Sequence, residues 1–150
     1  AGRVLEIDPS NGSTRLIGEE FAGEEKFSSI AAASNGRLYA PPACAGRVLE
    51  IDPSSGSTRL IGEEFAGDFK FYSIAAASNG RLYAPPAFAG RVLEIDPSSG
   101  STRLIGEEFA GEFKFSSIAA ASNGRLYAPP AFAGRVLEID PSNGSTRLIG

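Results

Sequence analysis

The segment AGRVLEIDPS, residues 1–10, occurs again at residues 45–54, 89–98 and 133–142. The chain therefore divides into three full repeats and a partial fourth: 1–44, 45–88, 89–132 and 133–150. A period near 44 residues with several short strands is typical of a β-propeller blade. Helical repeats of this length would need a sustained 3.6-residue apolar pattern, but Gly and Pro interrupt every window.

Each repeat predicts four strands joined by tight turns. In the second repeat, Lys70–Ala77 and Arg81–Pro85 flank an Asn-Gly pair, which is the strongest short hairpin signal. The next two strands, Arg91–Asp96 and Ser101–Gly106, flank the turn Pro97–Gly100, where Pro presets φ and Gly supplies a left-handed residue. We therefore predict an antiparallel four-stranded meander for every 44 residues.

The first strand of each meander is rich in alanine, as in Ile74–Ala77. Alanine has a poor strand preference, so we expect this strand to line the central channel of a propeller, where only small side chains fit. The alternative is a short helix, but the run is shorter than the roughly 12–15 residues that a helix needs on local grounds. The predicted fold is all-β, with four-stranded propeller blades in a ring of eight or nine, closed by assembly or by a longer chain.

The 150 residues supply fewer than four complete blades. An open arc would expose apolar side chains such as Leu5, Ile7 and Leu16 at its end. We therefore expect ring closure through other copies of the chain, joined head to tail, or within a longer polypeptide. Residues 1–18 and 133–150 have the same sequence and compete for one role, so deletion of residues 1–18 should leave assembly intact.

The full repeats differ at only five positions. The first repeat has Glu25 and Cys44 where the others have aromatic pairs, Phe69 with Phe88 and Phe113 with Phe132. The hairpin register predicts that the members of each pair are cross-strand or diagonal neighbours. Asp68 and Tyr72 distinguish the second repeat from the third, which has Glu112 and Ser116.

The fifth variable position suggests a longer period. The turn residue is Asn11 in the first repeat, Ser55 and Ser99 in the next two, and Asn143 in the fourth. This order indicates three blade types followed by a return to the first. A ring of nine blades would use that pattern three times.

Such near-identical repeats resemble designed or ancestrally reconstructed symmetric propellers, most closely the designs named Cake and Scone, which form rings of eight or nine blades. The resemblance covers the whole chain and rests on blade pattern and symmetry, without a catalytic motif. It implies a self-assembling structural scaffold with no biochemical activity. A recently amplified natural propeller would look similar, although the Gly-His and Trp-Asp signature of WD40 blades is absent.

The composition excludes several functional classes. With no His and one Cys, the chain cannot form a Ser/His/Asp triad, a His metal cluster, a Cys zinc site or an internal disulfide. Eighteen acidic against fourteen basic residues argue against nucleic-acid binding. The sequence contains no run of about twenty apolar residues, so we predict no membrane-spanning helix. We assign no catalytic, cofactor-binding or metal-binding residue, expect no enzyme activity or small-molecule ligand, and infer no compartment.

Two acidic features resemble chemical sites. Carboxylate pairs recur in loops, followed by further acidic residues, and we interpret them as solvated rather than catalytic: Glu19-Glu20, Glu63-Glu64 and Glu107-Glu108, then Glu24, Glu25, Asp68 and Glu112. Asp8–Ser13 resembles a calcium loop, but Ser10 and Gly12 occupy positions that need carboxylates or amides, which favours a turn.

Two further sets leave alternatives open. Arg3 with Glu6 and Asp8, and Arg37 with Tyr39, recur in each repeat and could form a ring of sugar-binding pockets, as in a multivalent carbohydrate-binding propeller. Salt bridges between blades and core packing, which would also hold Phe21 and Phe27, are the favoured interpretation. Cys44 has no His or nearby Lys to activate it, which favours a small buried residue over a nucleophile.

Overall fold

The computed structural model describes all residues from 1 to 150 and contains only β-strands. The first hairpin comprises β1 (Val4–Asp8) and β2 (Ser13–Ile17). The other strands follow in groups of four: β3 (Ala31–Ala32), β4 (Leu38–Ala40), β5 (Val48–Asp52), β6 (Ser57–Ile61); β7 (Ala75–Ala76), β8 (Leu82–Ala84), β9 (Val92–Asp96), β10 (Ser101–Ile105); β11 (Ala119–Ala120), β12 (Leu126–Ala128), β13 (Val136–Asp140), β14 (Ser145–Ile149). No helix of the length and apolarity required to cross a membrane is found.

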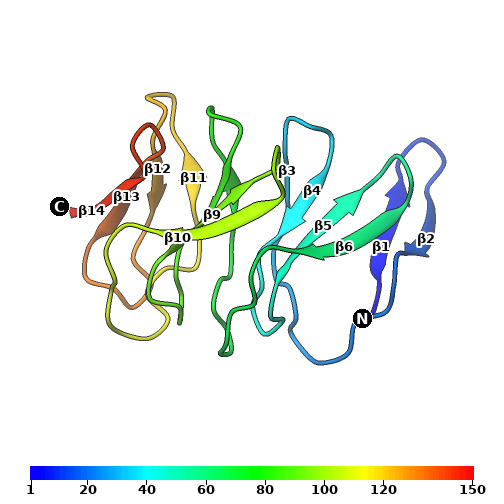
Figure 1. Cartoon of the computed structure of the whole chain (residues 1–150), viewed down its shortest axis with the longest axis horizontal. Coiled ribbons are helices and arrows are strands. Elements are labelled where there is room, and N and C mark those ends of the chain that lie inside the picture. The colour runs from blue at the N-terminus through cyan, green and yellow to red at the C-terminus, as the bar shows by residue number, and fades with distance from the viewer.

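Each group of four forms one antiparallel sheet in chain order, and β1–β2 forms a sheet of two strands. We call the sheets β3–β6, β7–β10 and β11–β14 blades A, B and C. The blades stand side by side in an arc, with the two chain termini at its opposite ends (Figure 1). The predicted all-β propeller fold with four-stranded blades is confirmed, and the Ala-rich segments are strands rather than helices.

The turn residues explain the hairpins. Gly100 has a φ of 68°, a conformation open to glycine, and its N–H donates to the Asp96 carbonyl over 2.9 Å. The inner hairpin turns at Asn79, whose side-chain oxygen accepts from the Arg81 N–H. The residues that the sequence pattern identified as turn residues therefore produce the predicted meander.

The inner strands are shorter than predicted. We expected pairing over Lys70–Ala77 and Arg81–Pro85, but β7 pairs with β8 at two positions, followed by an isolated bridge between Phe71 and Pro86. Successive prolines after Ala84 have no N–H to donate, so the ladder cannot continue. The inner strands β3, β7 and β11 lie next to one another, as expected for strands near a propeller axis.

The core lies between the blades. Phe71, Leu82 and Ile95 of blade B are buried together with Tyr39 and Val48 of blade A. An equivalent cluster joins blades B and C. A blade with a neighbour on each side packs one face on the preceding blade and the other face on the next. Adjacent apolar residues along a strand point to opposite faces, so both are buried.

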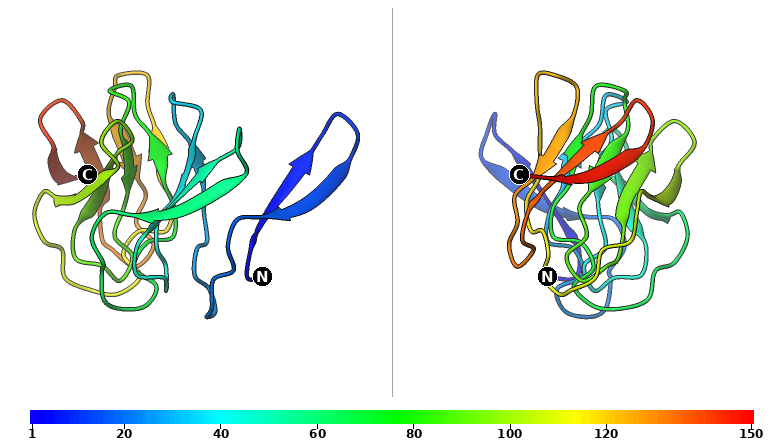
Figure 2. Two further views of the ribbon diagram at one scale, coloured as in Figure 1. Left: turned by 45° about the vertical axis from the view of Figure 1, so that its right-hand side comes forward. Right: turned by 90° about the vertical axis from the view of Figure 1, so that its left-hand side faces the viewer.

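The hairpin β1–β2 stands apart from the three blades in the rotated view (Figure 2). It touches blade A through Ile17, which is buried with Leu49 and Ile51. As expected, Leu5, Ile7 and Leu16 are exposed. They are 55%, 63% and 52% exposed, because no preceding blade covers this face of the hairpin, whereas blade A covers the equivalent Leu93 and Ile95.

Candidate functional site

Each blade contains the same polar cluster between its second, third and fourth strands. In blade A the Glu50 carboxylate accepts hydrogen bonds from Tyr39 Oη at 2.8 Å and from Arg59 Nε at 2.5 Å. The Arg37 guanidinium lies 3.9 Å from Glu50 and 3.8 Å from Asp52. The strand register produces this cluster, because Tyr39 pairs with Glu50 and Glu50 pairs with Arg59.

The cluster holds its charges in a defined state. Burial by itself would raise the pKa of Glu50, but the hydrogen bonds from Arg59 and Tyr39 outweigh it and hold the pKa below its usual range. In blade B, burial of the Tyr83 hydroxyl raises its pKa to about 12. The hydrogen bond that Tyr83 donates to Glu94 also favours its protonated form. The carboxyl group of Glu50 is therefore held in its ionised form, and the hydroxyl of Tyr83 is held in its protonated form.

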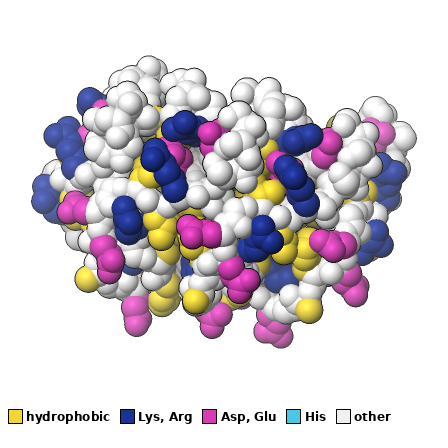
Figure 3. Space-filling view, in the orientation of Figure 1, with side chains coloured by type: hydrophobic (Ala, Val, Ile, Leu, Met, Phe, Trp, Pro, Cys, Tyr) yellow, Lys and Arg dark blue, Asp and Glu magenta, His cyan; other side chains and the backbone are white.

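A polar hollow opens over the cluster in every blade, with a volume of about 320 Å³ in A, 270 Å³ in B and 410 Å³ in C. The lining of the first is Arg37, Glu50, Asp52, Ser57, Thr58 and Arg59. No apolar side chain lines any of the three. Basic and acidic side chains lie side by side over the upper part of the face in Figure 3, whereas acidic side chains project along its lower edge.

The expectation of salt bridges between blades is wrong. Every ion pair connects strands of one sheet, such as Arg37 with Glu50 and Arg15 with Glu6. Arg3 binds neither Glu6 nor Asp8 but donates from Nε to the Gly18 carbonyl. Cross-strand pairing places opposite charges closer together within a blade than between blades.

Phe21, Phe27 and Tyr39 pack in or against the core as expected, and no aromatic side chain lines the polar hollows. The Phe21 and Phe27 rings meet edge to face with centroids 6.1 Å apart, and Tyr39 is fully buried. Sugar-binding sites commonly stack the sugar on an exposed aromatic ring. The hollows therefore offer hydrogen bonding without a stacking surface.

The acidic loops and the calcium-like segment have ordinary structural roles. The paired glutamates are exposed: Glu19-Glu20, Glu63-Glu64 and Glu107-Glu108. The Asp8 carboxylate accepts hydrogen bonds from the N–H and hydroxyl of Ser10, and these bonds lower the pKa of Asp8. Residues 8–13 thus form the turn that the sequence favoured.

The structure corrects two statements about Cys44. We expected a buried residue, but Cys44 is only partly buried. We expected no lysine nearby, but the Lys70 ammonium donates to the carbonyls of Ala43 and Ala45 on either side of it, at 3.0 and 2.8 Å. Lys70 is only 3% exposed and also donates to the Gly67 carbonyl. Sequence reasoning missed this buried lysine, although its place between Phe69 and Phe71 was a signal.

The variable pair is placed as predicted. The Cys44 N–H donates to the Glu25 carbonyl at 3.1 Å, and the Phe88 N–H donates to Phe69 at 3.2 Å. The Phe69 and Phe88 rings have centroids 6.0 Å apart. An open hollow of about 430 Å³ borders Glu25 and Cys44, where the other blades carry rings.

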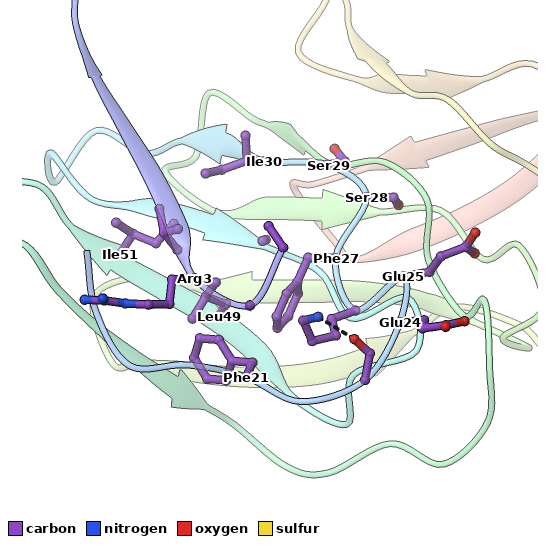
Figure 4. A pocket seen from close by; sticks show the side chains of 16 residues that line it. Arg3, Phe21, Glu24, Glu25, Phe27, Ser28, Ser29, Ile30, Leu49 and Ile51 are labelled. Atoms are coloured by element: carbon purple, nitrogen blue, oxygen red, sulfur yellow. Dashed lines mark hydrogen bonds between the residues drawn. The ribbon is translucent and has the colours of Figure 1, made fainter. Parts of the chain in front are cut away.

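An apolar cavity of about 640 Å³ lies between the β1–β2 hairpin and blade A. Phe21, Phe27, Ile30, Leu49 and Ile51 are among its lining residues, and Figure 4 shows them arranged around one space. In the other blades an inner hairpin of the preceding blade occupies the equivalent place. This cavity, half of whose lining residues are hydrophobic, is therefore an open blade junction.

Comparison with known proteins shows the fold alone. No protein-family model matches the sequence, and no curated protein matches it. Solved structures with a similar fold include virginiamycin B lyase from Staphylococcus aureus, with a TM-score of 0.80 and 14% identity, and Kuenenia stuttgartiensis hydrazine synthase, with 0.75 and 16%. The extracellular domain of a putative one-component system from B. thetaiotaomicron gives 0.66 and 15%.

Each comparison covers 99% of this chain but 48%, 43% and 22% of the respective neighbour. The chain thus spans less than half the length of these proteins. The neighbours include an enzyme and a sensor domain, and at such identities they share with this chain the propeller architecture.

Proposed function

We propose that this chain is a structural propeller module that associates head to tail with copies of itself and has no catalytic activity. The near-identity of its repeats supports a designed or consensus-like scaffold. The observation that carries the proposal is the open face of blade A, where Ile30 is 51% exposed although its equivalent Ile74 is only 8% exposed in the junction of blades A and B. An apolar surface left open at a blade junction favours association.

Head-to-tail association would repeat a contact that the chain already makes twice. Blade A packs on blade B and blade B on blade C through the same residues. A third junction of this kind would join blade C of one copy to blade A of the next. Each copy of these 150 residues would then contribute three blades, and three copies would form a ring of nine, one of the two expected sizes.

The native mass of the 150-residue chain tests this proposal. We expect an assembly with three times the chain mass of 15.6 kDa, observed by native mass spectrometry and sedimentation. A compact monomer at all accessible concentrations would contradict self-association.

A second candidate function is multivalent carbohydrate binding at the three polar hollows. It is favoured by one observation, the recurrence of the same two arginines, two carboxylates and two hydroxyl residues in every blade. A glycan array with the native assembly tests it. Binding of one sugar per blade that is lost in the triple variant Arg37→Ala, Arg81→Ala and Arg125→Ala would support this function over the scaffold.

A further inference from the structure

We propose that residues 1–18 are a displaceable cap on the surface of blade A to which blade C of a second copy docks. The inference rests on the proposed self-association and identifies the docking surface on this chain. It also identifies which of two identical hairpins gives way, β1–β2 of one copy or β13–β14 of the other. The two hairpins have the same sequence and would pack on the same part of blade A. Only one of them can therefore be there in the assembly.

The cap covers only the outer part of the blade A surface. Ile17 is 7% exposed and packs with Leu49 and Ile51. The equivalent residue of blade A, Ile61, packs in the same way against blade B. The β1–β2 hairpin therefore sits where the outer hairpin of a preceding blade would sit.

The inner part of the same surface is uncovered. Ile30 is 51% exposed, whereas its equivalent Ile74 is 8% exposed beneath the alanines of blade A. The Lys26 ammonium donates only to Gly23, whereas Lys70 also donates to two carbonyls of the preceding blade. An apolar side chain and an ammonium group thus face the 640 Å³ cavity, which both line.

Blade C of a second copy matches these features in position and chemistry. Residues 119–121, like 31–33, are alanines that would cover Ile30. The Ala131 carbonyl is equivalent to those of Ala43 and Ala87, which accept from Lys70 and Lys114, so it would accept from Lys26. The outer hairpin of this docking blade, β13–β14, would bring Ile149 to the place that Ile17 occupies. The occupant is therefore a complete blade of identical repeat sequence.

The cap is the weaker of the two competing hairpins. The β1–β2 hairpin is an isolated two-stranded sheet, and such a sheet is marginally stable on its own. The β13–β14 hairpin continues a four-stranded sheet, in which β13 pairs with β12 at three positions. Tyr127 also donates to Glu138 at 2.9 Å, and Arg125 pairs with it. Displacement of β1–β2 breaks none of these bonds.

A matched pair of variants tests the cap, because the same substitution in the same sequence should have opposite effects. Ile17→Ala loosens the cap and should tighten association by about tenfold, since less of the chain is held in the blocked state. Ile149→Ala removes a docking contact and should weaken association by about tenfold or more. Sedimentation equilibrium over a concentration series measures both. Weaker association in Ile17→Ala would overturn the cap and show that β1–β2 remains in the assembly.

A disulfide lock provides a second test. In a Cys44→Ala background, Ala128→Cys and Leu137→Cys replace residues that are paired between β12 and β13. The oxidised protein should associate as well as the reduced one, because β13–β14 stays with its blade. Loss of association on oxidation would show instead that β13–β14 is the displaced hairpin.

Deletion of residues 1–18 separates this inference from the proposed function. The shortened chain should associate more tightly than the full chain, because no cap competes. If neither chain associates at any concentration, self-association fails and the cap fails with it. If both associate equally, self-association stands and the cap is wrong.

Discussion

The hairpins β1–β2 and β9–β10 lie in segments that differ at one residue, yet they have different surroundings. Leu5 is 55% exposed and its equivalent Leu93 is fully buried, and Ile7 and Ile95 differ in the same way. Both hairpins have the same strand bounds and register. The local sequence therefore determines the hairpin, whereas the inner strands of the same blade and the neighbouring blade determine its burial.

The largest expected effect is the loss of stability when a buried leucine of the hairpin is shortened to alanine. Leu93→Ala should lower the free energy of unfolding by about 2–5 kcal/mol, because it opens a cavity in a closed junction. Leu5→Ala should lower it by less than about 1 kcal/mol in the monomeric chain, because the side chain already meets solvent. Urea denaturation at a concentration without association measures both. Equal losses would show that β1–β2 is packed as tightly as β9–β10.

The next effect concerns the polar cluster that β1–β2 lacks. Tyr83→Phe removes the hydrogen bond to buried Glu94, and a bond to a charged group contributes about 1.5–3 kcal/mol. Tyr127→Phe makes the same change in blade C, at the open end of the arc, where the bond is partly buried, so the loss should be smaller. Thermal unfolding of the two variants compares them. A greater loss in Tyr127→Phe would contradict the role assigned to burial.

Ionisation of Tyr83 should also make the stability of the fold depend on pH. Burial raises the pKa of Tyr83 to about 12, whereas an unfolded tyrosine ionises near about 10. Between these values the unfolded chain releases a proton that the folded chain keeps, so stability falls as pH rises. The stabilisation is fully present below about pH 10. Urea denaturation at several alkaline pH values should show a shallower decline in Tyr83→Phe, and an unchanged slope would contradict the assignment.

Much of the fold could be predicted because each repeat carries its own turn signals. The Asn-Gly and Pro-to-Gly turns place the hairpins, and the variable pair is opposite as the register requires. Contacts between blades could not be predicted, because they join residues far apart in sequence. The buried Lys70 and the pairing of charges within each blade became evident only when neighbouring strands were in place.

Local backbone conformation was also beyond the sequence. Glu25, Phe69 and Phe113 have φ values of 45°, 54° and 50°, in a region that usually favours glycine. The sequence marks a bend only two residues earlier, at Gly23, Gly67 and Gly111. Each carbonyl is held by the cross-strand N–H of its partner, such as Phe132 with Phe113 at 3.0 Å. The tertiary bond therefore overrides the local preference.

A smaller effect is expected from making the three blades alike. The double variant Glu25→Phe and Cys44→Phe should raise the stability by about 0.5–1.5 kcal/mol, the value of an aromatic pair beyond its area. Glu25 already has the backbone conformation of Phe69, and the adjacent hollow of about 430 Å³ has room for rings. Melting temperature measures the gain, with Glu25→Phe alone as the control. An unchanged or lower value would make the two residues incidental substitutions.

The smallest effect is expected at the turn residue that suggested three blade types. The Asn11 side chain accepts from the Ser13 N–H at 2.8 Å, and the Ser99 hydroxyl is hydrogen-bonded to that of Ser101 at 2.6 Å. Each residue thus has a partner within its own turn, and both turns end in a glycine of positive φ. Asn11→Ser and Ser99→Asn should therefore each change stability by less than about 0.5 kcal/mol, as exposed substitutions usually do. Thermal unfolding and native mass measure this. A change in the number of associated chains after either substitution would show that the turn residue directs blade order, because its local bonds could not account for it.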